Sequence, residues 1–166
     1  MGDVKGALEN FHKMQAIFEV LAAEKPTDRD ATHSVAIGFE KMGDVFSGAG
    51  DLAGSLAFYR KELAEDQRLV SLDPGNVQFV RDLYVPYEKI GTVLFKTGDR
   101  ISALHSYRQA LSICERLAAI DPENVGARND LVGILTLLAN AAAKARHITD
   151  ARSYQLRSLS MQKELA

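Results

Sequence analysis

A 48-residue repeat constrains the fold of this chain more than any other feature of its sequence. Pro26, Pro74 and Pro122 follow one another at intervals of 48 residues, and a Gly-Asp pair recurs at positions 2, 50 and 98. When residues 50–97 are aligned with residues 98–145 without a gap, 15 of the 48 positions are identical. Repeats of this length bury their apolar faces against neighbouring copies. The sequence therefore predicts a single repeat array over residues 1–166, with copies near 2–49, 50–97 and 98–145 and a partial copy at 146–166.

Each copy is expected to contain two helices. Apolar residues recur at three- and four-residue steps, for example Leu52, Leu56 and Tyr59. Asp73-Pro74 should end this first helix, because proline has no N–H and disfavours helical dihedral angles in the residue before it. Asn76 is placed to cap the next helix, which the following Gly-Asp pair should end. The pattern predicts about seven helices and no strand, near residues 4–24, 28–47, 52–72, 77–96, 100–120, 125–145 and 148–165.

Pro86 lies within the predicted helix at 77–96. A proline inside a helix removes one hydrogen bond and clashes with the preceding turn, at a cost of about 3 kcal/mol. We expect one continuous helix with a kink at this position, because a packed array can absorb that cost.

The order of small and large residues resembles the tetratricopeptide repeat (TPR) family. The residues that carry the resemblance are Tyr87, Ile90, Gly91, Leu94, Gly98, Asp99, Ala103, Tyr107, Ala110 and Leu111, answered one copy earlier by Phe39, Met42, Gly43, Phe46, Gly50, Asp51, Ser55 and Tyr59. The family has a usual period of 34 residues, so this chain resembles an elongated variety. The resemblance implies an all-α fold, a right-handed α-solenoid of antiparallel helix pairs that forms a TPR-like superhelix. Small residues in one repeat column would let neighbouring helices approach closely.

Several classes of function are not indicated by the composition and motifs. With 20 basic and 22 acidic residues, the net charge of −2 is too balanced for a nucleic-acid binder. No run of 18 apolar residues and no targeting signal is found, which predicts a cytoplasmic protein without a membrane span. His12, His33, His105 and His147 have no metal-ligand spacing, and Cys114 is expected to be a small, semi-buried helix residue. No catalytic motif is present, so the sequence predicts no enzyme, metal site or cofactor.

The resemblance implies instead that a protein or peptide partner binds on the concave face, which the first helix of each pair would line. The candidate groove residues are Glu40, Asp44, Arg81, Tyr84, Glu88, Thr92, Phe95, Lys96, Asn129, Thr136, Asn140 and Lys144. Related arrays that hold a carboxylate use basic residues and Asn on this face. Acidic groups at positions 40, 44 and 88 make that ligand a poor match here.

A structural or self-assembling role is the alternative. The chain is also similar to elongated TPR arrays within larger bacterial signalling and ATPase-linked proteins, where such a segment would stack on further repeats. Its first and last predicted helices are rich in apolar residues, including Leu8, Phe11 and Phe18 in the first and Leu156 and Leu159 in the last. Terminal repeats of a free-standing array normally present a polar outer face. The sequence therefore predicts either a fragment of a larger protein or a homo-oligomer formed through the terminal helices.

Overall fold

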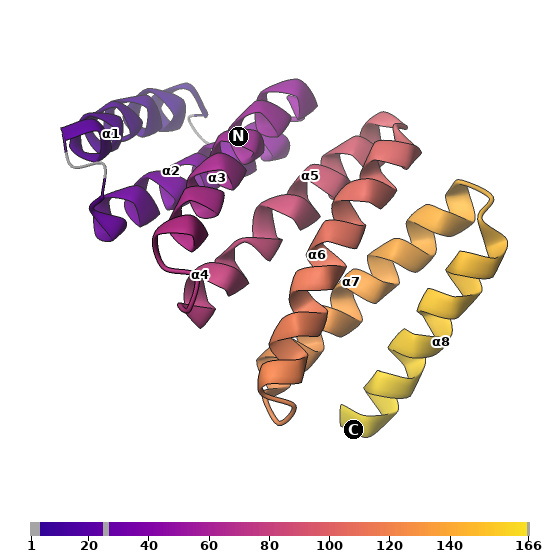
Figure 1. Ribbon diagram of the computed structural model, residues 1–166. Coiled ribbons are helices and arrows are strands. Elements are labelled where there is room, and N and C mark those ends of the chain that lie inside the picture. Colours follow the sequence, from indigo (N-terminus) through magenta and orange to yellow (C-terminus); the bar gives the residue numbers. More distant parts are fainter. Residues whose placement is uncertain (1–3, 25–26, 166) are drawn as a thin grey trace. The chain divides into compact units, whose positions relative to one another are not determined.

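The computed structural model describes residues 4–24 and 27–165, and within them the chain forms helices and no strand. The helices are α1 (Val4–Glu24), α2 (Arg29–Gly48), α3 (Leu52–Leu72), α4 (Val77–Asp82), α5 (Tyr84–Thr97), α6 (Arg100–Ile120), α7 (Val125–Lys144) and α8 (Ile148–Leu165) (Figure 1). The predicted all-α fold of paired helices is confirmed. Two compact units divide the chain, Met1–Pro86 and Tyr87–Ala166, and each is described by itself.

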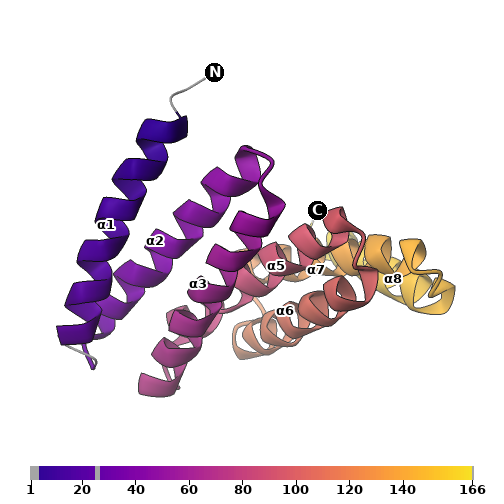
Figure 2. The same cartoon turned by 90° about the horizontal axis from the view of Figure 1, so that it is seen from above.

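The first unit is a layer of helices in which α2 packs against both α1 and α3 (Figure 2). Val35 and Phe39 of α2 form a buried cluster with the partly buried ring of Phe58 from α3. Met42 of α2 and Leu69 of α3 are also fully buried. Burial of these side chains, each favourable by about 1.5–3 kcal/mol, holds the hairpin of α2 and α3 together.

In the second unit α7 packs between α6 and α8. Its central side chains Ile134, Leu135 and Leu138 are buried, as is Tyr107 of α6. Cys114 is also fully buried, more deeply than the sequence predicted. Ala141 and Ala142 of α7 are buried as well, and because each side chain is only a methyl group, neighbouring helices can approach closely there.

Left-handed residues make the turns between paired helices. Gly50 and Gly98, which end the helices before them, have φ angles of 82° and 91°. Glycine adopts such angles without the steric cost that a Cβ atom imposes. At the equivalent position before α8 stands Arg146, which has a φ of 63° despite its side chain. The predicted glycine caps are therefore confirmed, and the last turn is made with a residue less suited to it.

Polar side chains begin the helices where the sequence predicts them. Asn76 accepts hydrogen bonds from the backbone N–H groups of Gln78 and Phe79 at the start of α4. Asn124 accepts one from Ala127 at the start of α7, with an N···O distance of 3.0 Å. Such caps satisfy amides that have no partner within the helix.

The predicted single helix at 77–96 is wrong in one respect, because the structure divides it at Leu83 into α4 and α5. Pro86 is the third residue of α5. Its missing N–H is therefore in the first turn, where amides have no acceptor within the helix. A break three residues before the proline removes the clash that a continuous, kinked helix would contain.

Candidate functional site

The predicted groove residues lie on the first helix of each pair, as expected, but in both compact units. The first unit contains Glu40, Asp44, Arg81 and Tyr84. The second contains Glu88, Thr92, Phe95, Lys96, Asn129, Thr136, Asn140 and Lys144. Five of them, Lys96, Asn129, Thr136, Asn140 and Lys144, are exposed, and the others are half-buried.

Two predicted groove residues contact the hydroxyl groups of tyrosines on the second helix of a pair. The Tyr59 hydroxyl donates a hydrogen bond of 2.8 Å to Asp44, and the hydroxyls of Tyr107 and Thr92 lie 3.1 Å apart. Burial and the bond to Asp44 raise the pKa of Tyr59 well above its ordinary value, so the hydroxyl keeps its proton. Asp44 and Thr92 thus help to fix the packing between paired helices in addition to any contact with a partner.

These two tyrosines pack against glycines of the preceding helices. A Cβ atom added to Gly91 would lie 2.7 Å from the Tyr107 ring, and one added to Gly43 would overlap the Tyr59 ring. Only glycine permits these close approaches. The small residue that the sequence predicts in this repeat column is therefore confirmed at both positions.

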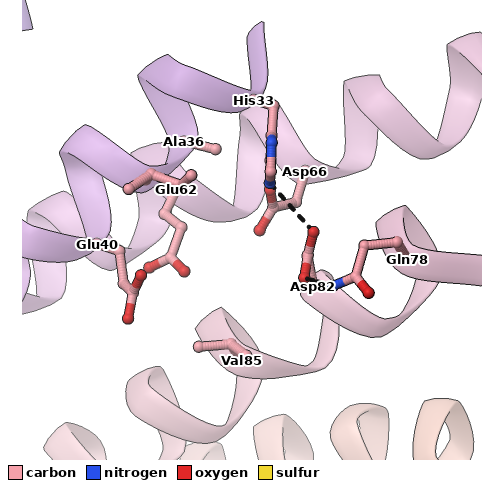
Figure 3. Close-up of a pocket in the computed structure, with 9 residues that line it drawn as sticks. His33, Ala36, Glu40, Glu62, Asp66, Gln78, Asp82 and Val85 are labelled. Carbon is pink, nitrogen blue, oxygen red and sulfur yellow. Dashed lines mark hydrogen bonds and ion pairs between the residues drawn. The ribbon is translucent and has the colours of Figure 1, made fainter. Parts of the chain in front are cut away.

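An acidic cavity is the most distinctive feature of the first unit. Its volume is about 220 Å³, and it lies between α2, α3 and α4, with one residue from the start of α5 (Figure 3). We call it the acidic cavity, and its lining consists of His33, Ala36, Ile37, Glu40, Glu62, Asp66, Gln78, Asp82 and Val85. Glu40 is the one lining residue that the sequence predicted as part of a binding surface. No lysine or arginine is among the described residues that line it.

The two acidic residues contributed by α3 are deeply buried. Glu62 is 4% exposed and Asp66 is 3% exposed. Figure 3 shows the Asp66 carboxyl directed into the space between α2 and α4. Burial, the largest cause, and the negative charges of Asp82, Glu40 and Glu65 together raise the pKa of Asp66 to about 7. Within the described part of the chain, Asp66 has no hydrogen-bond or ion-pair partner for its carboxyl.

Asp82, on the facing wall, is held by two neighbours. His33 Nε2 lies 3.2 Å from its Oδ2, which makes an ion pair when the imidazole is protonated. The Gln78 side-chain amide donates to its Oδ1 at 2.7 Å. These contacts fix the Asp82 carboxylate at the edge of the cavity and leave the charge near Asp66 negative.

Sequence reasoning missed His33, Glu62, Asp66 and Asp82. The apolar positions predicted for α3 are Leu52, Leu56, Tyr59, Leu63, Leu69 and Leu72. The structure buries Tyr59 and Leu69 of these, and it buries Ser55, Glu62 and Asp66 beside them on the helix. A signal was present, because the 48-residue alignment places Glu62 opposite Ala110 and Asp66 opposite Cys114. Both of those residues are buried in α6. The signal is that two acidic residues occupy repeat positions at which the next copy has small, buried residues.

A second cavity, of about 240 Å³, lies between α7 and α8. It includes the predicted groove residues Thr136 and Asn140, together with Gln155, Ser158 and Gln162. The hydroxyls of Thr136 and Ser158 lie 3.0 Å apart. Its polar lining is uncharged, so it offers hydrogen bonds without a net field.

Metal binding finds no support in the described residues, where no three or more His, Cys, Asp and Glu side chains are placed to hold an ion. The carboxyl groups of the acidic cavity are included in that statement. None of the described helices is long and apolar enough to span a bilayer.

Helix hairpins that repeat along the chain, turn on left-handed residues and pack an aromatic ring against a small residue define a helical-repeat protein. Residues 87–122 match the family described as tetratricopeptide repeat. This stretch, about a fifth of the chain, matches a tetratricopeptide repeat, which agrees with the resemblance seen in the sequence. The 48-residue length of the repeat stays a prediction.

Two solved structures have a similar fold. BtubC (BKLC) from P. vanneervenii matches with a TM-score of 0.69 and 17% identity, over 99% of this chain and 59% of that one. This chain thus spans about three fifths of the length of that protein. The N-terminal domain of stress-induced protein-1 (STI-1) from C. elegans matches with a TM-score of 0.55 and 18% identity, over 81% of this chain and 94% of that domain. No curated protein matches significantly in sequence. At these identities the likeness concerns the fold alone.

Proposed function

We propose that this chain is a non-catalytic interaction module that binds a peptide or a segment of a partner protein through the first helices of its pairs. Each compact unit has a cavity that includes groove residues predicted from the sequence, Glu40 in one and Thr136 and Asn140 in the other. Cavities with a few polar groups are the usual receptors for side chains of a bound segment. Repeat proteins commonly bind along such extended surfaces.

The exposed part of the predicted surface fits this role. Asn129, Asn140 and Lys144 of α7 are exposed and offer hydrogen-bond donors to a bound backbone. Half-buried aromatic residues, Tyr84 and Phe95 of α5, are candidates for the few anchors that dominate the affinity of such interfaces. A cytoplasmic location is part of this proposal.

Selection from a displayed library of random peptides tests the proposal without knowledge of the natural partner. We expect enriched peptides whose binding shifts the backbone NMR signals of α2, α4, α5 and α7 in the 166-residue chain. Asn140→Ala should weaken peptides that map to the second unit. Gln109→Ala, at an exposed position of α6, is the matched control and should not weaken them. Peptides that map to exposed positions of α3 and α6, or no enrichment in repeated selections, would count against the proposal.

A second candidate function, self-assembly, is supported by apolar residues on the terminal helices. Ile17 and Val20 of α1 are 60% and 57% exposed, and Leu156 and Leu159 of α8 are 57% and 46% exposed. Such residues are typical of contacts with another copy or with further repeats. Light scattering over a dilution series tests this: a mass that stays at one chain at every concentration contradicts self-assembly, and dimers sensitive to Leu156→Glu support it.

A further inference from the structure

The acidic cavity combines buried negative charge with the size of a single side chain. Asp66 is only 3% exposed, and its carboxyl has no partner within the described residues. Buried carboxyl groups in folded proteins are nearly always hydrogen-bonded or paired. A carboxyl that is neither, and that is directed into a cavity, is incomplete without something that occupies the cavity (Figure 3).

The charge of the lining selects a cation as that occupant. Glu40, Glu62, Asp66 and Asp82 contribute four carboxyl groups, and His33 is the one ionisable basic group among the described lining residues. Lys41 lies 3.2 Å from Glu40, but its ammonium is half exposed and it does not line the cavity. Charge complementarity of this kind determines which partner group is accepted more than it determines affinity.

A metal ion does not fit, because the described carboxyl and imidazole groups are not placed to coordinate one ion together. Groups that are spread around a cavity are matched better by a planar guanidinium, which has five N–H donors that point in different directions. An ammonium is a compact point charge with three donors and keeps its water more strongly.

The apolar lining fits the rest of an arginine side chain. Ala36, Ile37 and Val85 line the same cavity as the carboxyl groups. Ile37 is 43% exposed, so the cavity opens to solvent beside an apolar residue. Arginine packs its methylene groups along such surfaces while its charged end reaches polar partners. The volume of about 220 Å³ is below that of pockets for drug-sized ligands and suits one side chain.

We propose that the acidic cavity receives the guanidinium of an arginine side chain from a bound partner segment, with Asp66 and Glu62 at its floor. This inference rests on the proposed function and names the chemistry that the partner must present to the first unit. The expected ligand is opposite in charge to the carboxylates that some related arrays hold.

The probe that tests this is the blocked peptide acetyl-Gly-Ser-Arg-Ser-Gly-amide, added to the complete 166-residue chain with NMR detection. We expect shifts concentrated at Ala36, Ile37, Asp66 and Val85. The same peptide with citrulline, which has nearly the same shape and no charge, should bind at least about tenfold more weakly, because it cannot offset the buried negative charge. The lysine peptide should also bind more weakly than the arginine peptide. Equal binding of the citrulline peptide, or shifts outside the cavity, would overturn the proposal.

Variants separate the cavity from the general charge of the chain. Asp66→Asn should weaken the arginine peptide at least about tenfold. Glu19→Gln removes the same charge from an exposed position of α1 in the same unit and should leave affinity within about twofold. Circular dichroism confirms that both variants fold, and wild-type affinity in folded Asp66→Asn would refute the assignment.

A pH series supplies a readout that needs no variant. The groups facing Asp66 are His33, Glu40, Glu62 and Asp82, with Glu65 nearby on α3. Because the pKa of Asp66 is about 7, its ionised fraction rises about tenfold between pH 6 and pH 8. Affinity for the arginine peptide should therefore rise about tenfold from pH 6 to pH 8 at constant salt, and a flat or falling profile would contradict the proposal.

The two proposals fail in different ways. Library peptides that lack arginine and map to the first helices of the pairs, without shifts at the cavity, would leave the interaction module standing and refute the arginine site. Arginine-dependent shifts at the cavity, without any selected peptide on the remaining surface, would support the arginine site and count against the wider binding surface.

Discussion

Asp66 should make the stability of the chain fall as the pH rises, and Asp66→Asn should abolish that fall. In the folded chain the pKa of this carboxyl is about 7, whereas its ordinary pKa, expected in an unfolded chain, is 3.8. Between these values the folded state binds more protons than the unfolded state, so the free energy of unfolding decreases with increasing pH. The shift corresponds to a loss of about 3 kcal/mol between pH 5 and pH 8.

Urea unfolding followed by circular dichroism at a series of pH values measures this loss. We compare wild type with Asp66→Asn and with Glu19→Gln, whose carboxyl is exposed. The asparagine variant can be less stable at low pH, because its amide is buried without a partner, but its pH slope is the quantity of interest. Equal slopes in wild type and Asp66→Asn would refute the reasoning.

Four further substitutions test the packing and the helix ends by the same unfolding measurement. Gly91→Ala should destabilise the folded chain by about 1–3 kcal/mol, since the added Cβ would lie 2.7 Å from the Tyr107 ring. Its control, Gly133→Ala, has open space around it and should stabilise the chain by about 0.5–1 kcal/mol. Equal effects of the two substitutions would contradict the packing argument. Asn124→Ala should cost about 1 kcal/mol through the lost cap of α7, and an unchanged midpoint would argue against that cap. Arg146→Gly should stabilise by about 0.5–1 kcal/mol, because its φ of 63° suits glycine, and a loss of stability would contradict this.

The helix ends and turns could be predicted because their causes are local. Asn76 and Asn124 accept from amides two or three residues further along the chain. Gly50 and Gly98 make their turns through their own dihedral angles. Each of these features depends on a few neighbouring residues, which is the information that a sequence carries directly. The break before Pro86 was harder to place, because a proline permits either a kink or a new helix start, and packing decides between them.

The binding surface was predicted less completely because it depends on which face of each helix is buried. The apolar positions predicted for α3 include Leu52, Leu56 and Leu63 as well as Tyr59 and Leu69. The structure buries Tyr59 and Leu69 and leaves Leu52, Leu56 and Leu63 only partly buried. Hydrophobic periodicity considers only apolar residues, so it does not predict that acidic residues on the same helix are buried.

Comparison between repeat copies supplies what periodicity lacks. Position 59 and position 107 are both tyrosine and both pack on a glycine of the preceding helix, so the two columns have the same environment at that point. One and two turns further along, Ala110 and Cys114 fill the column in α6, whereas Glu62 and Asp66 occupy it in α3. Burying a carboxyl where a small apolar side chain would serve lowers stability. The cost that Asp66 imposes near neutral pH is therefore offset only when a cation occupies the acidic cavity, and this couples the stability of the first unit to the arginine ligand that we propose.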